Sequence, residues 1–213
     1  MNKLLILGAG GHGKVIAEIA ELSNKFDNIS FLDDSKIGSS ILGHTVIGRF
    51  NDYINLQQEY NSAFVAVGNN ALRLELTHKL LSIGYNIPTL LHPNSIISKH
   101  SFIDIGTAVM AGAVVNPSCK IGKACIINTS CSIDHDCNIE DGVHISPGAH
   151  VSGTVNIACC SWISTGASII NNISVGSNSI IAAGATVLSD VPSNVMVAGT
   201  PAEIKRIYKG CEK

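Results

Sequence analysis

The stretch "IGTAVMAGAVVNPSCKIGKACIINTSCSI", residues 105–133, carries an aliphatic residue at every sixth position. The same spacing extends in both directions, from Ile97 to Val187, and all sixteen of these consecutive positions are Ile or Val. A period of six is typical of the hexapeptide β-helix, in which each hexapeptide forms a short strand and a turn. Gly, Asn or Asp often follows three residues later, as at Gly112 and Asp190, and these residue types suit a corner with positive φ.

Three hexapeptides complete one triangular coil, so residues eighteen apart stack, and roughly five coils at about 4.8 Å each give a prism of about 24 Å. Small or aliphatic residues precede each sixth-position aliphatic by two, and four successive repeats use cysteine there: Cys119, Cys125, Cys131 and Cys137. A ladder of cysteines is also a metal-binding pattern. Neighbouring repeats carry Ala, Ser or Thr at this position, which favours small apolar core residues, and we expect no metal.

The residues before the repeats follow a different pattern, in which short apolar runs predict strands and helical apolar spacing predicts helices. The strands are expected at 3–7, 29–34 and 62–70, and the helices at 13–22 and 71–85. Strands that alternate with helices indicate a small parallel α/β sheet. The sequence therefore predicts an α/β half-Rossmann-like domain over residues 1–90 and a β-helix with a C-terminal tail over residues 91–213.

The charge and hydropathy of the chain exclude some classes of partner. The 213 residues carry a net charge of −2 without a long run of Lys or Arg, so neither nucleic acid nor an anionic membrane is expected to bind. Glycines interrupt the apolar N-terminus by residue 8, and we find neither a cleavable signal pattern nor an apolar run long enough to span a bilayer. We expect a cytoplasmic protein.

The first predicted strand runs into the turn "GAGGHGK", residues 8–14, which fits two phosphate-binding patterns. A P-loop needs Ser or Thr after the lysine to hold Mg²⁺, and Val15 stands there instead. The dinucleotide pattern G-x-G-x-x-G fits better, because Asp33 and Asp34 follow about twenty residues later, where a carboxylate can bind a ribose hydroxyl. So short a domain is one mononucleotide-binding half, which suits a nucleotide sugar. The alternatives are glycines that serve only strand–helix packing and a Lys14 that is merely solvated.

The order of these features resembles the hexapeptide-repeat sugar O- and N-acyltransferases. That family combines a nucleotide-binding α/β domain, whose turn reads G-x-G-G-H-[GA]-K, with a left-handed β-helix and a late GTPA segment. The matching parts here are residues 8–14, 97–192 and 199–202. The chain looks like the branch of the UDP-N-acetylbacillosamine N-acetyltransferases. The resemblance implies a homotrimer that binds acetyl-CoA between adjacent prisms and acetylates the 4-amino group of a UDP-linked 4-amino-4,6-dideoxy sugar.

The resemblance also points to the residues that hold the nucleotide sugar. The glycine turn is similar to turns that bind the UDP of a UDP-sugar, and a second loop is expected to line the nucleoside. The substrate-binding candidates are Gly10, Gly11, His12, Gly13, Asp33, Asp34, Gly68, Asn69 and Asn70.

Acetyl transfer to an amine favours a general base with a pKa near 7, and histidine is the natural choice. His135 follows Ile133 at an outward corner of the predicted coil. Pro117 lies one coil below it and Gly153 one coil above, so nothing bulky covers the imidazole. The Gly153 backbone N–H is also a candidate donor to the oxyanion.

The family's active-site stretch matches residues 128–150, and the match implies a role for each polar side chain. His135 is the base and Asp136 its polarising partner. Because the family more commonly has the longer Glu at this place, Asp134 is an alternative partner. His144 is expected to donate to the acetyl carbonyl or the thioester, and Asn128 to contact the sugar or its amine.

The expected acetyl-CoA residues are His144, Gly153, Gly166 and Gly184. Gly148, Gly166 and Gly184 stack at steps of eighteen and make a bare corner column on which a pantetheine arm can lie. The need for positive φ at a corner explains these glycines equally well. Trp162, Lys205 and Arg206 are expected near the CoA phosphates by their position alone.

Other functions remain open at this stage. A sialic acid O-acetyltransferase or a GDP-sugar acetyltransferase has the same parts. A non-catalytic nucleotide-sugar-binding module has no use for the His135–Asp136 pair. A carbonic anhydrase on a similar prism needs three histidines around zinc, and it leaves the N-terminal domain unexplained.

Overall fold

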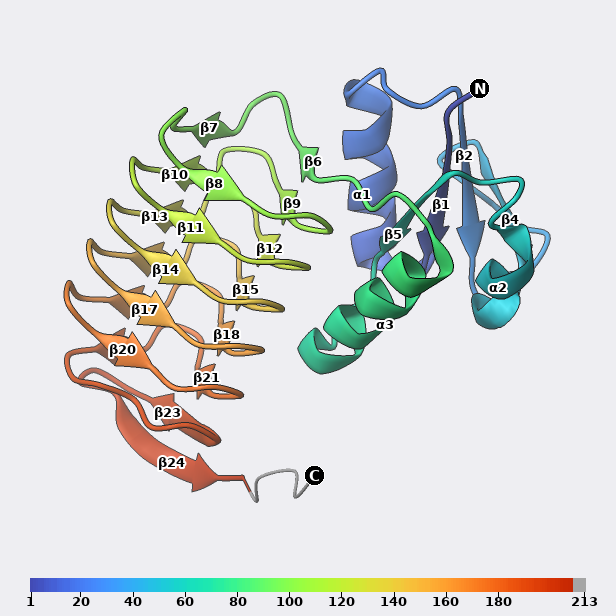
Figure 1. The fold of residues 1–213 in the computed structure, drawn as a ribbon. Helices are drawn as coiled ribbons and strands as arrows, with labels where there is room; N and C mark the ends of the chain where they lie inside the picture. Colours follow the sequence, from blue (N-terminus) through green and yellow to red (C-terminus); the bar gives the residue numbers. More distant parts are fainter. Residues whose placement is uncertain (209–213) are drawn as a thin grey trace. The chain divides into compact units, whose positions relative to one another are not determined.

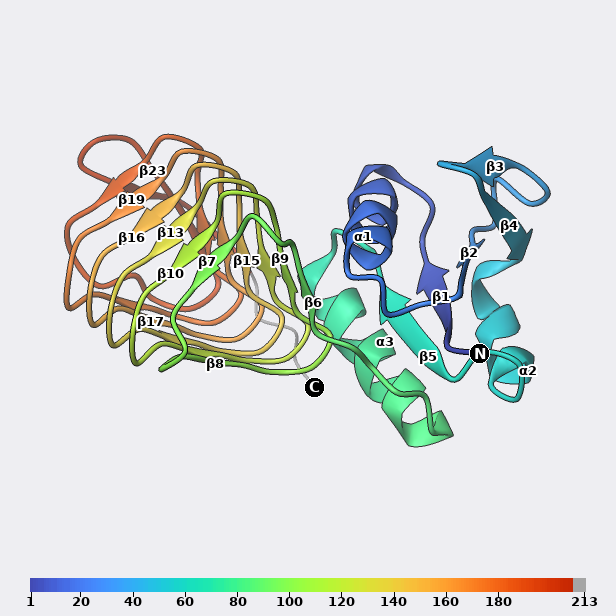
Figure 2. The ribbon, with the colours of Figure 1, turned by 90° about the horizontal axis from the view of Figure 1, so that it is seen from above.

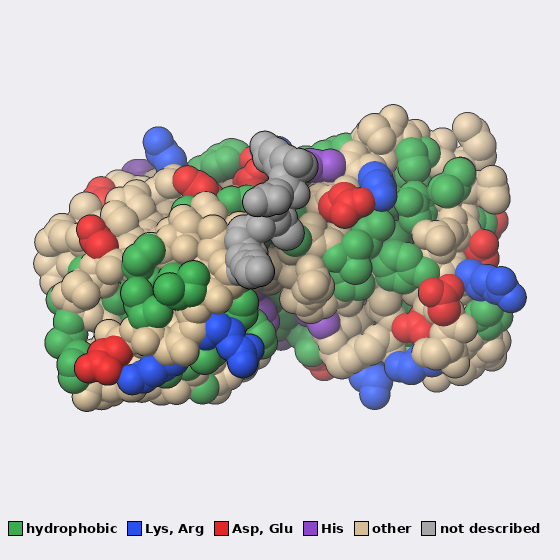
Figure 3. All heavy atoms as spheres, turned by 90° about the horizontal axis from the view of Figure 1, so that it is seen from below, with side chains coloured by type: hydrophobic (Ala, Val, Ile, Leu, Met, Phe, Trp, Pro, Cys, Tyr) green, Lys and Arg blue, Asp and Glu red, His purple; other side chains and the backbone are tan. Residues whose placement is uncertain are grey.

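The computed structural model describes residues 1–208 and divides into two compact units. The first unit is Met1–Pro93 and the second begins at Asn94, three residues after the predicted boundary. Basic and acidic side chains are interspersed on the face shown in Figure 3, as the balanced composition suggests. Among residues 1–208, no helix combines the length and the apolar character that a membrane crossing requires.

The first unit is built on a five-stranded sheet with the order β3-β4-β2-β1-β5 (Figure 1). Its strands are β1 (Lys3–Leu7), β2 (Asn28–Leu32), β3 (Ser40–Ile41), β4 (His44–Gly48) and β5 (Ser62–Val65). Its helices are α1 (Gly11–Leu22), the 3₁₀ turn η1 (Phe50–Asp52), α2 (Tyr53–Leu56) and α3 (Asn70–Ile83), and β6 (Leu90–Leu91) follows. Each predicted strand and helix is present, although β2 and β5 end at Leu32 and Val65, before the predicted residues 34 and 70. The β3–β4 hairpin and α2 were not predicted.

Strand β1 lies at the centre of this sheet, parallel to β2 on one side and to β5 on the other. Its residues Leu4 to Leu7 are fully buried, as expected for a parallel strand covered on both faces. The carboxyl ends of β2, β1 and β5 meet at one edge of the sheet. The loops that follow these strands carry the Asp33–Asp34 pair, the glycine turn and the Gly68–Asn70 segment respectively. This edge is where ligands bind in open α/β sheets.

The second unit is a left-handed parallel β-helix with three sheets, which we call the first, second and third prism sheets (Figures 1 and 2). The first contains β7 (Ile96–Ile97), β10 (Val114–Val115), β13 (Ser132–Ile133), β16 (His150–Val151), β19 (Ser168–Ile169) and β22 (Thr186–Val187). The second contains β8 (Phe102–Ile103), β11 (Lys120–Ile121), β14 (Asn138–Ile139), β17 (Asn156–Ile157) and β20 (Ser174–Val175). Within the second unit, the strands of the third are β9 (Ala108–Val109), β12 (Ile126–Ile127), β15 (His144–Ile145), β18 (Trp162–Ile163), β21 (Ile180–Ile181), β23 (Val195–Ala198) and β24 (Glu203–Ile207).

The sixth-position aliphatics fill the core of the prism, as predicted. Those from Val109 to Val187 are buried, and Ile97 and Ile103 pack against them at the N-terminal end. Paired strands are in register at eighteen residues, as in Val115 opposite Ile133. The cysteine ladder is confirmed as core, because Cys119, Cys125, Cys131 and Cys137 are each at most 1% exposed.

The corners of the coils adopt positive φ, as the Gly, Asn and Asp positions predicted. Ala124, Ser130 and Asp136 do so without being glycine or asparagine, with φ of 53°, 54° and 59°. The prediction for Asp190 was wrong, since positive φ occurs instead at Asn194. Asp190 Oδ1 accepts the backbone N–H of Ser174 at 2.8 Å, so this residue closes the last complete coil with its side chain.

Candidate active site

His135 and Asp136 form a hydrogen-bonded pair at the corner between β13 and β14. His135 Nδ1 lies 2.8 Å from Asp136 Oδ2, and each side chain is 58% exposed. Asp134 has other partners, because its Oδ1 accepts the backbone N–H of His135 and the side-chain amide of Asn116. The shorter aspartate therefore reaches the imidazole, and the alternative partner Asp134 is excluded from that role in this structure.

The pairing sets the proton positions of the imidazole. An ionised carboxylate only accepts, so His135 donates from Nδ1, and the neutral ring then has an unprotonated Nε2. The hydrogen bond to Asp136 raises the pKa of His135, and the charges of Asp134 and Asp136 act in the same direction. An exposed imidazole of fixed tautomer with a raised pKa is suited to accept a proton at Nε2.

Gly153 makes room for the His135 ring. A Cβ placed at Gly153 would lie 2.6 Å from His135 Cε1 and 2.7 Å from Nε2, well inside normal contact. The residue is buried and does not have positive φ, so close approach of the ring, rather than backbone conformation, accounts for glycine here. Its N–H donates to no acceptor among residues 1–208, so it points to no competing partner within the chain.

A second cluster lies on the outer face of the third prism sheet. Asn128 Nδ2 is 3.1 Å from His144 Nε2, so the structure brings these two predicted residues together. Trp162, on the next strand of the same sheet, stacks on His144 with ring centroids 5.8 Å apart and an interplanar angle of 5°. The Trp162 Nε1–H donates to Ser146 Oγ at 2.7 Å. Trp162 therefore contacts the His144 cluster, a contact that its predicted place near the CoA phosphates did not anticipate.

These two clusters belong to opposite sides of one prism. His135 stands at the corner that joins the first and second sheets, whereas His144 belongs to the third sheet and Asn128 directly follows strand β12 of that sheet. In a triangular coil, a corner lies across the core from the sheet that does not form it (Figure 2). A single chain therefore cannot direct the His135 and His144 side chains at one small substrate.

The corner column Gly148, Gly166 and Gly184 is open. Their φ values are 63°, 66° and 68°, and a Cβ at each would meet nothing within 4 Å. The column has space for a ligand, and the positive φ also accounts for glycine without one. Lys205 pairs with Glu203 at 2.9 Å on β24, and Arg206 is exposed beside it, so contact of these side chains with CoA stays a prediction.

The glycines of the first turn divide into two groups. Gly8 has φ of 107° and faces the Ala66 carbonyl, and a Cβ at Gly13 would collide with the Gly8 carbonyl oxygen. These two serve close packing, and ligand contact by the buried Gly13 stays a prediction. Gly10 and Gly11 are exposed, and a Cβ at either would meet nothing within 4 Å. Packing therefore does not explain glycine at the start of α1, where free N–H groups favour an anion.

Side chains of the loop after β2 hold the backbone of the glycine turn. His12 lies partly buried in the first turn of α1, and Lys14 is exposed on the same helix. Asp33 Oδ2 accepts the Ala9 N–H at 3.0 Å, and Lys36 Nζ donates to the Ala9 carbonyl at 2.6 Å. Burial would raise the pKa of Asp33, but hydrogen bonds from Ser35 and Ala9, with the Lys36 charge, lower it. The turn is thus held by a carboxylate and an ammonium from the loop after β2.

Three other predicted nucleotide residues have structural partners. Asp34 Oδ1 accepts the Phe50 N–H at 3.0 Å, and Asn69 caps α3 through the Leu72 N–H at 2.9 Å. Asn70 Oδ1 accepts from the guanidinium of Arg73, which is 1% exposed and also donates to the Val67 and Gly68 carbonyls. Gly68 is exposed beside them. Substrate contact by these side chains stays a prediction.

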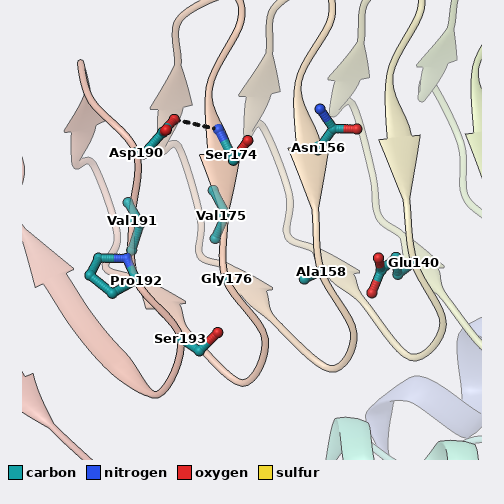
Figure 4. Close-up of a pocket in the computed structure, with 10 residues that line it drawn as sticks. All are labelled: Glu140, Asn156, Ala158, Ser174, Val175, Gly176, Asp190, Val191, Pro192 and Ser193. Atoms are coloured by element: carbon teal, nitrogen blue, oxygen red, sulfur yellow. Dashed lines mark hydrogen bonds between the residues drawn. The ribbon is translucent and has the colours of Figure 1, made fainter.

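A groove of about 440 Å³ crosses the second prism sheet near its C-terminal end (Figure 4). Its lining includes the carboxylates of Glu140 and Asp190 and the small residues Ala158 and Gly176. None of the predicted site residues lines it. Two carboxylates disfavour the phosphates of CoA or of a nucleotide, so we do not assign this groove to either substrate.

The sequence reasoning missed Ser146, Lys36 and Arg73. Ser146 is a small polar residue within a repeat that uses many of them, so nothing distinguished it. Arg73 stands in a run with helical apolar spacing, where an arginine is ordinarily expected on the solvated face. Lys36 follows Asp33, Asp34 and Ser35 in a polar loop, where a lysine is ordinarily solvated, and its contact with the Ala9 carbonyl depends on the fold of that loop.

Comparisons with known proteins agree with this architecture. The family described as the PglD N-terminal domain matches residues 3–80. A curated UDP-N-acetylbacillosamine N-acetyltransferase of Bacillus subtilis (strain 168) is 37% identical over 113 residues, and the match spans 52% of each chain. The matched part therefore spans only about half the length of this curated relative.

Solved structures match over almost the whole chain. The acetyltransferase domain of PglB from Neisseria gonorrhoeae FA1090, solved in complex with acetyl coenzyme A, is 41% identical with a TM-score of 0.92. That match covers 96% of this chain and 100% of the other. PerB from Caulobacter crescentus, in complex with CoA and GDP-perosamine, is 32% identical with a TM-score of 0.89, covering 97% of this chain and 98% of the other. With its α/β domain, its prism and these relatives, the chain belongs to the hexapeptide-repeat family of sugar acyltransferases.

Proposed function

We propose that the protein is an acetyl-CoA-dependent N-acetyltransferase that acts on the 4-amino group of a UDP-linked 4-amino-4,6-dideoxy sugar. The observation that carries this proposal is the His135–Asp136 pair, an exposed imidazole with Nε2 unprotonated beside the free N–H of Gly153. The name and CoA complexes of the relatives support the substrate class. Both co-substrates are charged metabolites, and we place the reaction in the cytoplasm.

The reaction we propose is a direct attack in a ternary complex. The amine nitrogen attacks the thioester carbonyl carbon, and His135 Nε2 takes the proton that the amine loses. Asp136 stabilises the resulting imidazolium. The oxyanion accepts hydrogen bonds from the Gly153 N–H and from His144 until the C–S bond breaks. The CoA thiolate then leaves and takes the proton from the imidazolium, which restores the base.

The proposed assembly is a homotrimer with a site between neighbouring prisms. The positions of His135 and His144 on opposite sides of one prism support it, because only a second copy can bring the two imidazoles to one substrate. His135, Asp136 and Gly153 then come from one subunit, and Asn128 and His144 from the next. The pantetheine arm of acetyl-CoA follows the corner column of Gly148, Gly166 and Gly184. Gly166 and Gly184 are the predicted cofactor contacts in this column.

The nucleotide site we propose lies at the glycine turn. The exposed N–H groups of Gly10 and Gly11, with His12, receive the diphosphate, and the helix dipole of α1 favours its charge. Asp33 and Asp34 lie at the ribose. Gly68, Asn69 and Asn70 line the nucleoside, on the loop after the neighbouring strand β5.

Release of free thiol from acetyl-CoA tests the reaction, with a small panel of acceptors. The panel contains the UDP-linked 4-amino-4,6-dideoxy sugar, its GDP-linked counterpart, and free or CMP-linked sialic acid. Fast release with the UDP-sugar alone supports the proposal as stated. Release with none of them rejects it. A blank without acceptor removes any signal from the protein's own thiols.

One observation favours a second acceptor, the GDP-linked amino sugar. PerB, whose structure holds GDP-perosamine, is similar over almost the whole chain. The catalytic pair and the oxyanion donor serve either nucleotide, so the panel separates the two by relative kcat/KM. An acceptor with a hydroxyl in place of the amine distinguishes O- from N-acetylation in the same assay.

Mixing two inactive variants tests the shared site. His135→Ala and His144→Ala each remove one half of every site. If one site uses both imidazoles from different copies, random 1:1 mixing after dissociation restores about a quarter of wild-type activity. If each chain carried a complete site, mixing would restore nothing.

A further inference from the structure

Trp162 is a large aromatic side chain on the outer face of the third prism sheet, and it is 42% exposed. Its neighbours in the same outward column are Ile126, His144 and Ile180, each on successive coils of the sheet. Ile126 is 2% exposed, so His144 lies between a buried aliphatic side chain and the indole. The planes of the indole and the imidazole are nearly parallel, with an interplanar angle of 5° and ring centroids 5.8 Å apart, so the two rings stack side against side along the column.

The indole itself is held in place. Its Nε1–H donates to Ser146 Oγ at 2.7 Å, and Ser146 is 2% exposed. Ser146 belongs to the coil of His144, two residues further along the chain, so the anchor of the indole and the imidazole move together. The hydrogen bond fixes the rotation of the indole, and stacking then restricts the plane of the imidazole.

Asn128 determines which nitrogen of His144 carries the proton. Asn128 Oδ1 accepts the backbone N–H of Thr129 at 2.8 Å, which orients the amide so that Nδ2 faces His144. An amide nitrogen only donates, so His144 Nε2 is the acceptor in this contact. A neutral imidazole carries one N–H, and in His144 it is therefore on Nδ1.

We propose that Trp162 is a positioning residue for His144: with Ser146 as its anchor, it fixes the imidazole plane while Asn128 fixes the Nδ1–H tautomer. A histidine held this way presents one N–H in one direction, as an oxyanion donor requires. The relevance of this to catalysis rests on the proposed function, in which His144 donates to the acetyl carbonyl. The positioning itself belongs to the free protein and needs no substrate.

The test compares Trp162→Phe, Trp162→Leu and Ser146→Ala with the wild type. Phenylalanine keeps an aromatic face on His144, leucine removes it, and Ser146→Ala keeps the indole without its anchor. Ile180→Ala is the matched control, one coil beyond Trp162 in the same column. Each variant is measured by ¹⁵N-imidazole NMR of the free protein, by kcat and KM, and by its melting temperature.

In wild-type protein we expect a pyridine-type ¹⁵N shift at His144 Nε2 and a pyrrole-type shift at Nδ1. Trp162→Leu frees the plane of the imidazole, and a ring that turns loses the Asn128 hydrogen bond that selects the tautomer. This variant is therefore expected to move both shifts towards the tautomer average and to lower kcat about tenfold, with a smaller change in KM. Trp162→Phe is expected to restore most of both, and Ser146→Ala to fall between them.

Unchanged His144 shifts in a folded Trp162→Leu variant would overturn the proposal, whatever the activity. So would a pyrrole-type Nε2 in the wild type. If Trp162→Leu does not fold, unchanged shifts in Ser146→Ala overturn it instead. If no acceptor is acetylated but the shifts behave as expected, the proposed function fails and the positioning stands.

Discussion

Replacing Gly153 with alanine is expected to remove most of the acetyl-transfer activity while leaving the fold intact. The new Cβ would lie 2.6 Å from His135 Cε1, about 0.8 Å short of the 3.4 Å at which ordinary contacts begin. Gly153 does not have positive φ, so alanine strains no backbone there. The His135 ring is 58% exposed and free to swing into solvent, which relieves the clash at little cost in stability.

That swing breaks the 2.8 Å hydrogen bond between His135 and Asp136 and moves Nε2 by about the size of the clash. Displacements near 1 Å cost on the order of 10²-fold in rate, so kcat should fall by about that factor. Gly153 itself is buried, but the group that yields is the exposed His135 ring, so we expect a cost of about 0.5 kcal/mol and a melting temperature lower by only a few degrees.

The assay is thiol release from acetyl-CoA with the acceptor that the panel identifies, measured for Gly153→Ala, His135→Ala and the double variant. If alanine acts only through the imidazole, the double variant is no slower than His135→Ala. Asn171→Ala, at the exposed position one coil further along, is the control. A Gly153→Ala enzyme with wild-type turnover would refute the reasoning, as would a double variant much slower than His135→Ala.

Three further outcomes are expected from the same structure. Asp136→Asn should lower kcat about 10²-fold and move the acid limb of the pH–rate profile to lower pH. Without the carboxylate, the raised pKa of His135 returns towards its ordinary value, so the base stays neutral at lower pH, and an unmoved limb would contradict the pairing. In a Cys211→Ser background, iodoacetamide and mass spectrometry should label the partly exposed Cys159 and Cys160 in native protein, with Cys159 the slower because its hydrogen bond with Cys160 raises its pKa. The four prism cysteines are each at most 1% exposed and should stay unlabelled until unfolding, so native labelling of the core would count against the packing. Asp33 has a lowered pKa in the folded state, so its stabilising effect is present above the unfolded pKa and is lost as pH falls through the folded pKa. Asp33→Asn should therefore lower the stability of the first unit at neutral pH and flatten its acid unfolding curve, followed by circular dichroism. An unchanged curve would show that the Ala9 and Ser35 hydrogen bonds contribute little.

Much of the fold could be predicted because it repeats. Each aliphatic from Ile97 to Val187 is weak information alone, but its recurrence at a fixed interval identifies strand, core and corner together. The first unit was predicted less completely, since β3 has only two residues and no periodic pattern. The prediction of positive φ at Asp190 failed because its side-chain oxygen, rather than a backbone turn, accepts the Ser174 N–H. Sequence periodicity cannot distinguish these two arrangements.

The candidate site divides in the same way. Spacing placed His135 at an outward corner and Gly153 above it, because both follow from the repeat. Whether Asp136 or Asp134 reaches the imidazole depends on ångström-scale orientation, which the repeat does not encode. The stacking of Trp162 on His144 was within reach, since eighteen residues separate them, yet residue type alone favoured a role at the ligand.

The eighteen-residue register also limits how the length of the prism can change. Adding or removing a whole coil makes the prism longer or shorter, and every later side chain keeps its face. A six-residue insertion or deletion moves every later residue to the next face of the prism. Placed between His135 and His144, it would move His144 off the third sheet while His135 stayed at its corner. The length of the prism can therefore vary only by whole coils of eighteen residues. Insertions of other lengths are tolerated at the corners, where the extra residues loop outward and the register of the following strands is kept.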